Sequence, residues 1–253
     1  MKTLPLVSCL TATYGRYTVL TEAISCFLAQ DYPNKELIIL NNHPAKLICD
    51  LPEVIIYNEP GYPTLGDCRN RLLDLAEGEF VRTWDDDDLY LPWAISQGIL
   101  MIPDNAPAWK PLRSWGWQVK EDRIYLGGNK YEASWTTRIE IAKKYGYISN
   151  SGGNEHNKLE EGIRKEGGIP RMDVGASGAS YVYRWGSGLC RISGSLDKTK
   201  NNIAERTERW KKQNDDHGDG KPIKPVSLIK YWERIERARY ELDAHTNETG
   251  KTV

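Results

Sequence analysis

The chain has 253 residues, of which 40% are hydrophobic and 27% are charged, as in ordinary soluble globular proteins. Its 34 Lys and Arg residues balance its 35 Asp and Glu residues to a net charge of -1, so no overall basic field favours nucleic acid or anionic lipid. No apolar run reaches the roughly 18 residues of a membrane span, and the N-terminus lacks the features of a signal peptide.

The first hundred residues alternate between apolar β-type runs and amphipathic helical patterns. The runs predict strands at 4–11, 36–40, 54–57 and 79–84. Apolar residues at helical spacing predict helices over 20–28 and 65–75. This order favours an α/β fold, an open and mostly parallel sheet with helices on both faces.

Three polar segments lie at the predicted carboxyl ends of these strands, at 11–16, 41–43 and 85–88. In open α/β sheets, ligands bind in the crevice outside that edge. The three segments therefore predict a ligand site before any family is considered.

The second half of the chain is less regular. Its patterns predict helices at 93–102, 138–145 and 155–165 and strands at 115–120, 123–126, 132–136 and 181–183. Beyond residue 195 the composition becomes highly charged, with helical patterns at 198–213 and 226–245.

Asp85, Asp86, Asp87 and Asp88 form a run of four adjacent carboxylates. Because they repel one another, the run needs a cation or shifted pKa values. Alternate residues of an extended chain face the same side, so one pair can face a ligand while Asp88 caps the next helix. The run alone fits a solvated loop equally well. The apolar strand before it and the segment 89–92 after it favour a cation site, of the kind in which Mg²⁺ combines one or two carboxylates with phosphate oxygens.

Five short stretches occur in a characteristic order and spacing. They are VSCLTATYGR at 7–16, AQDYPNKELII at 29–39, GDCRN at 66–70, AEGEFV at 76–81 and WDDDD at 84–88. Together they resemble the nucleotide-binding half of a family 2 glycosyltransferase, which has the A-type fold of the nucleotide-diphospho-sugar transferase superfamily. The resemblance covers residues 5–95.

The resemblance implies a role for each loop. The base and ribose end of the donor would be lined by the loop that carries Thr11, Thr13, Tyr14 and Arg16. Close to the diphosphate, or bracing the aspartate strand, would be Asp67, Arg69 and Asn70.

The acidic run would correspond to the "DXD" motif of this family. Its metal-binding carboxylates would be Asp85 and Asp87, with Asp87 favoured because its distance from the segment 90–92 matches the family. Asp86 would contact the ribose. The implied metal is Mn²⁺ or Mg²⁺, and the implied donor is a nucleoside-diphosphate sugar, with a UDP-sugar favoured.

Asn41 and Asn42 depart from the family, which usually has an aspartate pair after the second strand. An amide can both donate and accept, so either residue can still read a base edge. A turn before Pro44 is the alternative role for this pair.

The downstream acidic motif of the family, Glu-Asp followed by two residues and Leu, is similar to EHNKL at 155–159. The resemblance implies that this motif supplies the general base. Both Glu155 and His156 titrate in an accessible range and can be tuned by burial, so either can act. We favour Glu155, for which stabilisation of a helix N-terminus is the alternative role.

Arg191 stands where the family tends to carry a late metal-binding histidine. An arginine does not ligate a metal, but it can bind diphosphate oxygens directly. His217, in a polar loop, is a weaker substitute for that histidine.

The predicted function is that of a soluble, metal-dependent, inverting glycosyltransferase acting on an acceptor hydroxyl. The acceptor stays open between a saccharide, a protein, a small molecule and a hydroxylated base of modified DNA. Two alternatives are a nucleotidyltransferase of similar fold and a non-catalytic sugar- or protein-binding module. The single glycine in 11–16 disfavours the first, and the intact acidic run disfavours the second.

The predicted organisation is a catalytic domain at 1–195 followed by a charged helical extension at 196–253 with a disordered tail. The catalytic domain divides into a nucleotide-sugar half at 1–103 and an acceptor half at 104–195. The helices of the extension either wrap the core or mediate a homodimer. Five scattered cysteines without a CxxC pair indicate reduced thiols in a cytoplasmic protein, and no membrane insertion is expected.

Overall fold

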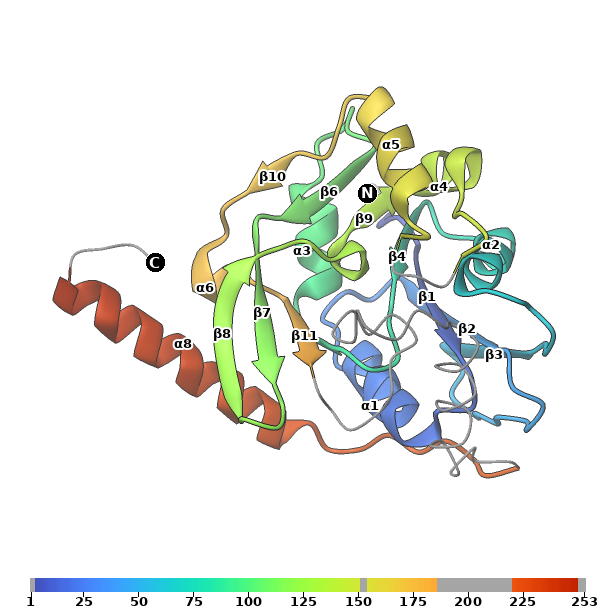
Figure 1. The fold of residues 1–253 in the computed structure, drawn as a ribbon, viewed down its shortest axis with the longest axis horizontal. Helices are drawn as coiled ribbons and strands as arrows, with labels where there is room; N and C mark the ends of the chain where they lie inside the picture. The colour runs from blue at the N-terminus through green and yellow to red at the C-terminus, as the bar shows by residue number, and fades with distance from the viewer. Residues whose placement is uncertain (1–2, 151–153, 186–219, 250–253) are drawn as a thin grey trace, which may run out of the picture.

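Two sheets organise the fold of the computed structural model, which describes residues 3–150, 154–185 and 220–249 (Figure 1). The larger sheet has seven strands in the order β10-β6-β9-β4-β1-β2-β3. These strands are β1 (Val7–Thr13), β2 (Lys35–Asn41), β3 (Val54–Asn58), β4 (Phe80–Thr83), β6 (Ala108–Pro111), β9 (Thr136–Arg138) and β10 (Arg171–Met172). Neighbouring strands are parallel except where β9 pairs with β4 and β6. The predicted α/β class with a mostly parallel sheet is therefore confirmed.

The smaller sheet has four strands in the order β5-β11-β7-β8. They are β5 (Leu89–Tyr90), β7 (Arg113–Gln118), β8 (Arg123–Gly128) and β11 (Tyr181–Trp185). β5 follows the acidic run directly, and β11 pairs with it in antiparallel fashion. The smaller sheet therefore lies immediately beside the predicted metal site.

Helices connect the strands and cover the large sheet (Figure 1). In chain order they are α1 (Tyr17–Leu28), α2 (Leu65–Leu75), α3 (Ala94–Met101), the 3-10 helix η1 (Glu132–Ser134), α4 (Ile139–Tyr145), α5 (Asn157–Lys165), α6 (Gly175–Gly178) and α8 (Ile229–Thr249). No helix among these described residues is long and apolar enough to cross a membrane.

Strand β2 shows why both faces of the large sheet are covered. Leu37 and Ile39 join a hydrophobic core with α1, whereas Ile38 and Leu40 join a second core with α2. Because successive side chains of a strand point to opposite faces, a continuous apolar run must be buried on both. The predicted covering by helices on two faces follows from this run.

The described part of the C-terminal extension packs onto the first of these cores. Ile223, Leu228 and Ile235 are buried in the cluster that also contains α1. Helix α8, red in Figure 1, lies beside β8. The predicted helix at 226–245 is thus present as α8, while the predicted helix at 198–213 and the predicted domain boundary at 195 fall outside the described residues.

Two local predictions are wrong. Residues 132–134 form η1 instead of a strand, because Asn129 Nδ2 donates to Ser134 Oγ over 2.8 Å and its Oδ1 accepts from the Tyr131 amide, which closes a turn. Asp88 does not cap a helix, since α3 begins only at Ala94 after its N-cap Trp93.

Candidate functional site

A cavity of about 800 Å³ lies where the loops after β1, β2 and β4 meet. All three polar segments predicted at this edge contribute to its wall. From the first half of the chain it is lined by residues that include Thr13, Tyr14, Arg16, Asn42, Tyr62, Arg69, Asp85, Asp86 and Asp87. The second half contributes Lys130, Tyr131, Glu132, Ala133, Glu155, His156, Tyr181 and Tyr183.

Arg16 neutralises two carboxylates of the acidic run. Its Nη1 lies 2.8 Å from Asp86 Oδ1, and its Nη2 lies 3.0 Å from Asp87 Oδ2. Thr13 Oγ1 also donates to Asp86 Oδ2 over 2.7 Å. These contacts fix Asp86 and Asp87 against the loop that follows β1, which explains how two adjacent carboxylates remain buried together.

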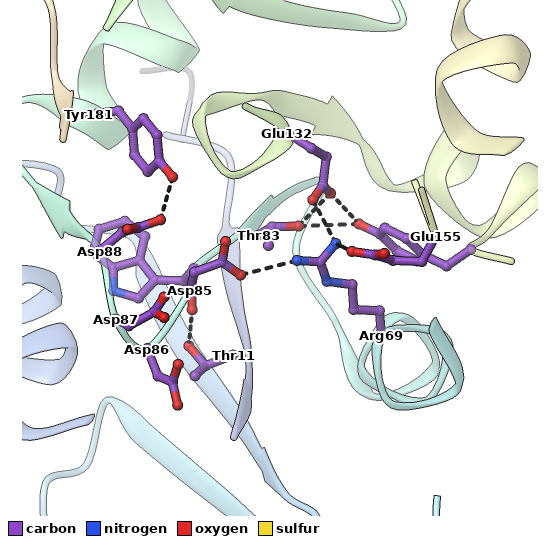
Figure 2. Close-up of polar contacts among 12 residues, drawn as sticks. Thr11, Arg69, Thr83, Asp85, Asp86, Asp87, Asp88, Glu132, Glu155 and Tyr181 are labelled. Carbon is purple, nitrogen blue, oxygen red and sulfur yellow. Dashed lines mark hydrogen bonds and ion pairs between the residues drawn. The ribbon is translucent and has the colours of Figure 1, made fainter. Parts of the chain in front are cut away.

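Asp88 is not among the residues that line the cavity, and its carboxylate points toward Tyr181 of β11 in the smaller sheet (Figure 2). Its carboxylate accepts hydrogen bonds from the Tyr181 hydroxyl and, over 2.9 Å, from the Arg184 amide. It therefore joins the acidic run to β11 in place of the cap that was predicted.

Asp85 is the most exposed of the carboxylates that line the cavity, at 34% for its side chain. Burial raises the pKa of Asp85 to about 7, an effect that Arg69 opposes and that Asp88 and Asp87 reinforce. A carboxylate whose charged form is disfavoured in this way is one that a nearby cation would stabilise.

Arg69 binds three carboxylates that come from three different parts of the chain (Figure 2). Its Nη2 lies 3.1 Å from Asp85 Oδ1, and its Nη1 lies 3.0 Å from both Glu132 Oε2 and Glu155 Oε1. Arg69 is itself buried. A single guanidinium thus connects the predicted metal ligand Asp85 to the predicted base Glu155.

Glu132 anchors this arrangement and was not predicted as a site residue. Its Oε1 accepts hydrogen bonds from Thr83 Oγ1 over 2.5 Å and from the Tyr147 hydroxyl over 2.6 Å. Its other oxygen binds Arg69. Only its contacts with Arg69, Thr83 and Tyr147 in the fold reveal this role, because nothing in the neighbouring sequence distinguishes Glu132 from an ordinary surface glutamate.

Glu155 and His156, the two predicted candidates for the base, both line the cavity. Glu155 is buried and precedes α5, whose N-cap is His156. The His156 ring meets the Trp135 ring edge-on, with centroids 6.1 Å apart. The structure thus brings both side chains to the cavity that three residues of the acidic run also line.

Four of the predicted site residues that the structure describes do not line the cavity. Thr11 Oγ1 donates to the Trp84 carbonyl over 2.6 Å, and Asp67 accepts from Thr64 at the start of α2. The other two are Asn41, whose amide binds Gly15, Ala45 and Asn58, and Asn70, which binds the backbone of Tyr147. These side chains shape the loops, and only Asn42 of the asparagine pair faces the cavity. Arg191 and His217 lie outside the described residues.

Aromatic residues that sequence reasoning missed line the side of the cavity next to the smaller sheet. Tyr131 and Tyr183 stack with centroids 4.2 Å apart and an interplanar angle of 13°. Tyr181 packs against Tyr131 at 5.6 Å. Because Tyr131 precedes Tyr181 and Tyr183 by 50 and 52 positions in the sequence, no local pattern marks them as neighbours.

The charge of the cavity is unbalanced. Its lining includes five acidic side chains, which are Asp85, Asp86, Asp87, Glu132 and Glu155, and only three basic ones, which are Arg16, Arg69 and Lys130. No group of three or more His, Cys, Asp or Glu side chains in the described part of the chain is arranged to hold a metal by itself.

Comparison with known proteins gives a consistent result. Residues 8–144 match the family model described as glycosyl transferase family 2. WcaA of Escherichia coli (strain K12), named as a glycosyl transferase of colanic acid biosynthesis, is 33% identical over 104 residues. The match covers 38% of this chain and only 37% of that relative.

Solved structures share the fold at low sequence identity. S. aureus TarS 1-349 in complex with UDP-GlcNAc has a TM-score of 0.59 and 13% identity, over 84% of this chain and 72% of that one. The mannosyltransferase PcManGT from Pyrobaculum calidifontis, in complex with GDP-Man and Mn²⁺, has a TM-score of 0.55 and 13% identity, over 99% and 77% of the two chains. At such identities the likeness establishes the fold alone.

Proposed function

The chain belongs to glycosyl transferase family 2, and from that premise we propose that it transfers a sugar from a nucleoside diphosphate to an acceptor hydroxyl with the help of a divalent cation. The family favours this function over the nucleotidyltransferase and the binding module considered above. The cavity beside the acidic run is the proposed donor site.

The excess of acidic side chains in the cavity is the observation that carries the proposal. A diphosphate brings further negative charge, and like charges repel strongly in a partly buried site. A divalent cation between the carboxylates and the diphosphate removes this conflict, and Mg²⁺ is commonly bound through one or two carboxylates and substrate phosphates. Asp85 and Asp87 would hold it, since both line the cavity and Asp85 has a raised pKa.

The loops after β1 and β2 are the proposed binding site for the nucleoside. Tyr14 lines the cavity and meets the His43 ring edge-on at 4.8 Å. Asn42 fixes the opposite loop, because its Oδ1 accepts from the amides of Gly61 and Tyr62 over 2.8 and 2.9 Å. A base inserted between these loops would meet aromatic rings and amide groups, which suit stacking and edge recognition. The nucleotide sugars in the TarS and PcManGT complexes support a donor of this class.

The proposed reaction is a single displacement with inversion. Glu155 accepts the proton of the acceptor hydroxyl while that oxygen bonds to the anomeric carbon, and the bond from this carbon to the diphosphate breaks. A bound cation would neutralise the charge that develops on the leaving diphosphate. Arg69 keeps Glu155 and Asp85 at a fixed separation, because it binds both carboxylates at once.

The acceptor is proposed to enter over the stacked pair Tyr131 and Tyr183. These rings and His156 line the part of the cavity that the second half of the chain contributes. A sugar ring or a planar base would both stack there, so a saccharide and a hydroxylated base remain the acceptor classes that this surface fits best.

A donor screen tests the proposal. Thermal shift measurements with UDP-sugars and GDP-sugars, with and without Mn²⁺, should identify a donor that raises the melting temperature only in the presence of the cation. Hydrolysis of that donor should then require Mn²⁺ and stop on addition of EDTA. Absence of any cation-dependent shift across the screen would refute the proposal.

Two substitutions test the assigned residues. Asp87→Asn should abolish donor hydrolysis while Asp74→Asn, on an exposed residue of α2, should leave it unchanged. Glu155→Gln should abolish sugar transfer but retain donor binding, whereas His156→Gln should retain transfer. The reverse result for the last two would make His156 the base.

A further inference from the structure

The C-terminal segment 220–249 contacts the elements that surround the acidic run. The Ile223 amide donates to the Ile48 carbonyl over 2.8 Å, and Tyr17 of α1 donates its hydroxyl to Pro222 over 2.8 Å. The Val226 amide donates to Ser25 Oγ of α1 over 2.8 Å. The segment therefore lies across α1 before it continues into α8.

Tyr231 of α8 reaches from this segment into a buried ion pair. Its hydroxyl donates to Glu22 Oε1, and Glu22 Oε2 lies 2.6 Å from Arg184 Nη1. The Arg184 side chain is only 5% exposed and that of Glu22 17%. Burial and the bond to Glu22 raise the pKa of Tyr231 to about 12, which is the direction expected for a hydroxyl that donates to a carboxylate. The Tyr231 ring also lies 5.8 Å below the Arg184 guanidinium.

Arg184 connects this ion pair to the backbone of the acidic run. Its Nε donates to the Asp87 carbonyl over 2.6 Å, and its amide donates to Asp88 Oδ1 over 2.9 Å. Arg184 therefore binds the backbone carbonyl of Asp87, whereas Arg16 binds the side chains of Asp86 and Asp87. The direction in which the Asp87 carboxylate points depends on the backbone that Arg184 fixes.

We propose that Arg184, Glu22 and Tyr231 are positioning residues for the metal-binding carboxylate of Asp87, so that α8 is part of the donor site machinery. None of the three lines the cavity. Their contribution passes through the Asp87 backbone, because the Arg184 guanidinium donates to the Asp87 carbonyl through Nε and binds Glu22 through Nη1. The inference rests on the proposed function, since it assigns a purpose to the placement of Asp87.

The test measures the Mn²⁺ concentration needed for half-maximal binding of UDP and, separately, of GDP by the full chain. Tyr231→Phe removes one hydroxyl and keeps the ring, and Tyr240→Phe is the matched control on a residue of the same helix that is 76% exposed. Tyr231→Phe removes a hydrogen bond to the charged Glu22 carboxylate. We expect this loss to raise the required Mn²⁺ concentration by about three- to tenfold. Tyr240→Phe should leave it unchanged.

A coupled pair of variants separates positioning from simple destabilisation. Glu22→Gln should raise the Mn²⁺ requirement as Tyr231→Phe does, and the double variant should add nothing further, because both act through Arg184. All measurements are made well below the lowest melting temperature of the set. A lower melting temperature with an unchanged Mn²⁺ requirement would overturn the inference, and additive effects of the two substitutions would also overturn it. Wild-type protein that binds neither nucleotide with Mn²⁺ would refute the proposed function as well.

Discussion

Replacement of Glu132 by glutamine tests whether the three-carboxylate contact of Arg69 is a structural necessity. The substitution keeps the shape of the side chain and removes its charge. Glu132 accepts three hydrogen bonds, one of them from the buried guanidinium. A buried bond to a charged group contributes about 1.5 to 3 kcal/mol, and loss of one partner from a buried ion pair costs about 3 to 5 kcal/mol. Arg69 keeps its contacts with Asp85 and Glu155 in this variant. We therefore expect the free energy of unfolding to fall by about 2 to 3 kcal/mol, less than for a buried ion pair that loses its only partner.

Urea unfolding followed by tryptophan fluorescence measures this loss. The matched control is Glu160→Gln, which breaks the ion pair of Glu160 with Arg164, whose side chain is 66% exposed. An exposed pair at this helical spacing is worth about 0.3 to 0.5 kcal/mol. Equal losses in the free energy of unfolding for the two variants would show that the buried contacts of Glu132 stabilise the protein no more than an exposed ion pair does.

Three further predictions concern buried cysteines and a closely packed glycine. Burial raises the pKa of the Cys9, Cys26 and Cys68 thiols to about 12, so iodoacetamide at pH 8 should leave all three unmodified in the folded protein and label them in urea, as peptide mass spectrometry can show. The unfolded chain loses these protons near pH 9 while the folded chain keeps them, so the free energy of unfolding should fall as the pH rises above about 9; a constant value up to pH 11 would contradict this. Gly66→Ala would place a Cβ atom 1.8 Å from the Ile148 carbonyl oxygen and should cost about 1 to 3 kcal/mol in urea unfolding, whereas Gly128→Ala, with nothing within 4 Å, should cost little; equal effects would contradict the close approach.

The fold of the first half was predictable because its signals are local. The apolar run of β2 demands burial on both faces, and the polar segments mark where the strands end. The strand predicted at 132–136 lies instead at β9 (Thr136–Arg138), because a turn that depends on Asn129 precedes it. β6 was missed because its apolar character is confined to two residues, Ala108 and Trp109. Tertiary pairing, with no local pattern behind it, decides these strands.

The acidic run was predictable as part of a ligand site because it follows a strand at the carboxyl edge of the sheet. The roles of Arg69 and Glu155 came from the family resemblance, and the structure brings both of them together with Asp85. Glu132, Arg184 and the pair Tyr131 and Tyr183 escaped prediction, since their importance arises from contacts across the chain. Asn41 was assigned to the donor because an amide can read a base, but its bonds to Gly15 and Asn58 direct it into the loop.

The antiparallel strand β9 has a consequence for the independence of the two halves. It occupies the free side of β4, whose other side pairs with β1, and it also links β6 and β10 to the rest of the sheet. A fragment that ends at residue 103 would expose the backbone of β4 as an open edge, and open edges recruit other chains into aggregates. Such a fragment would also lack Glu132 of η1, which binds Arg69. The proposed nucleotide site therefore depends on both halves of the fold, and a truncated N-terminal fragment is expected to aggregate before it could bind a nucleotide.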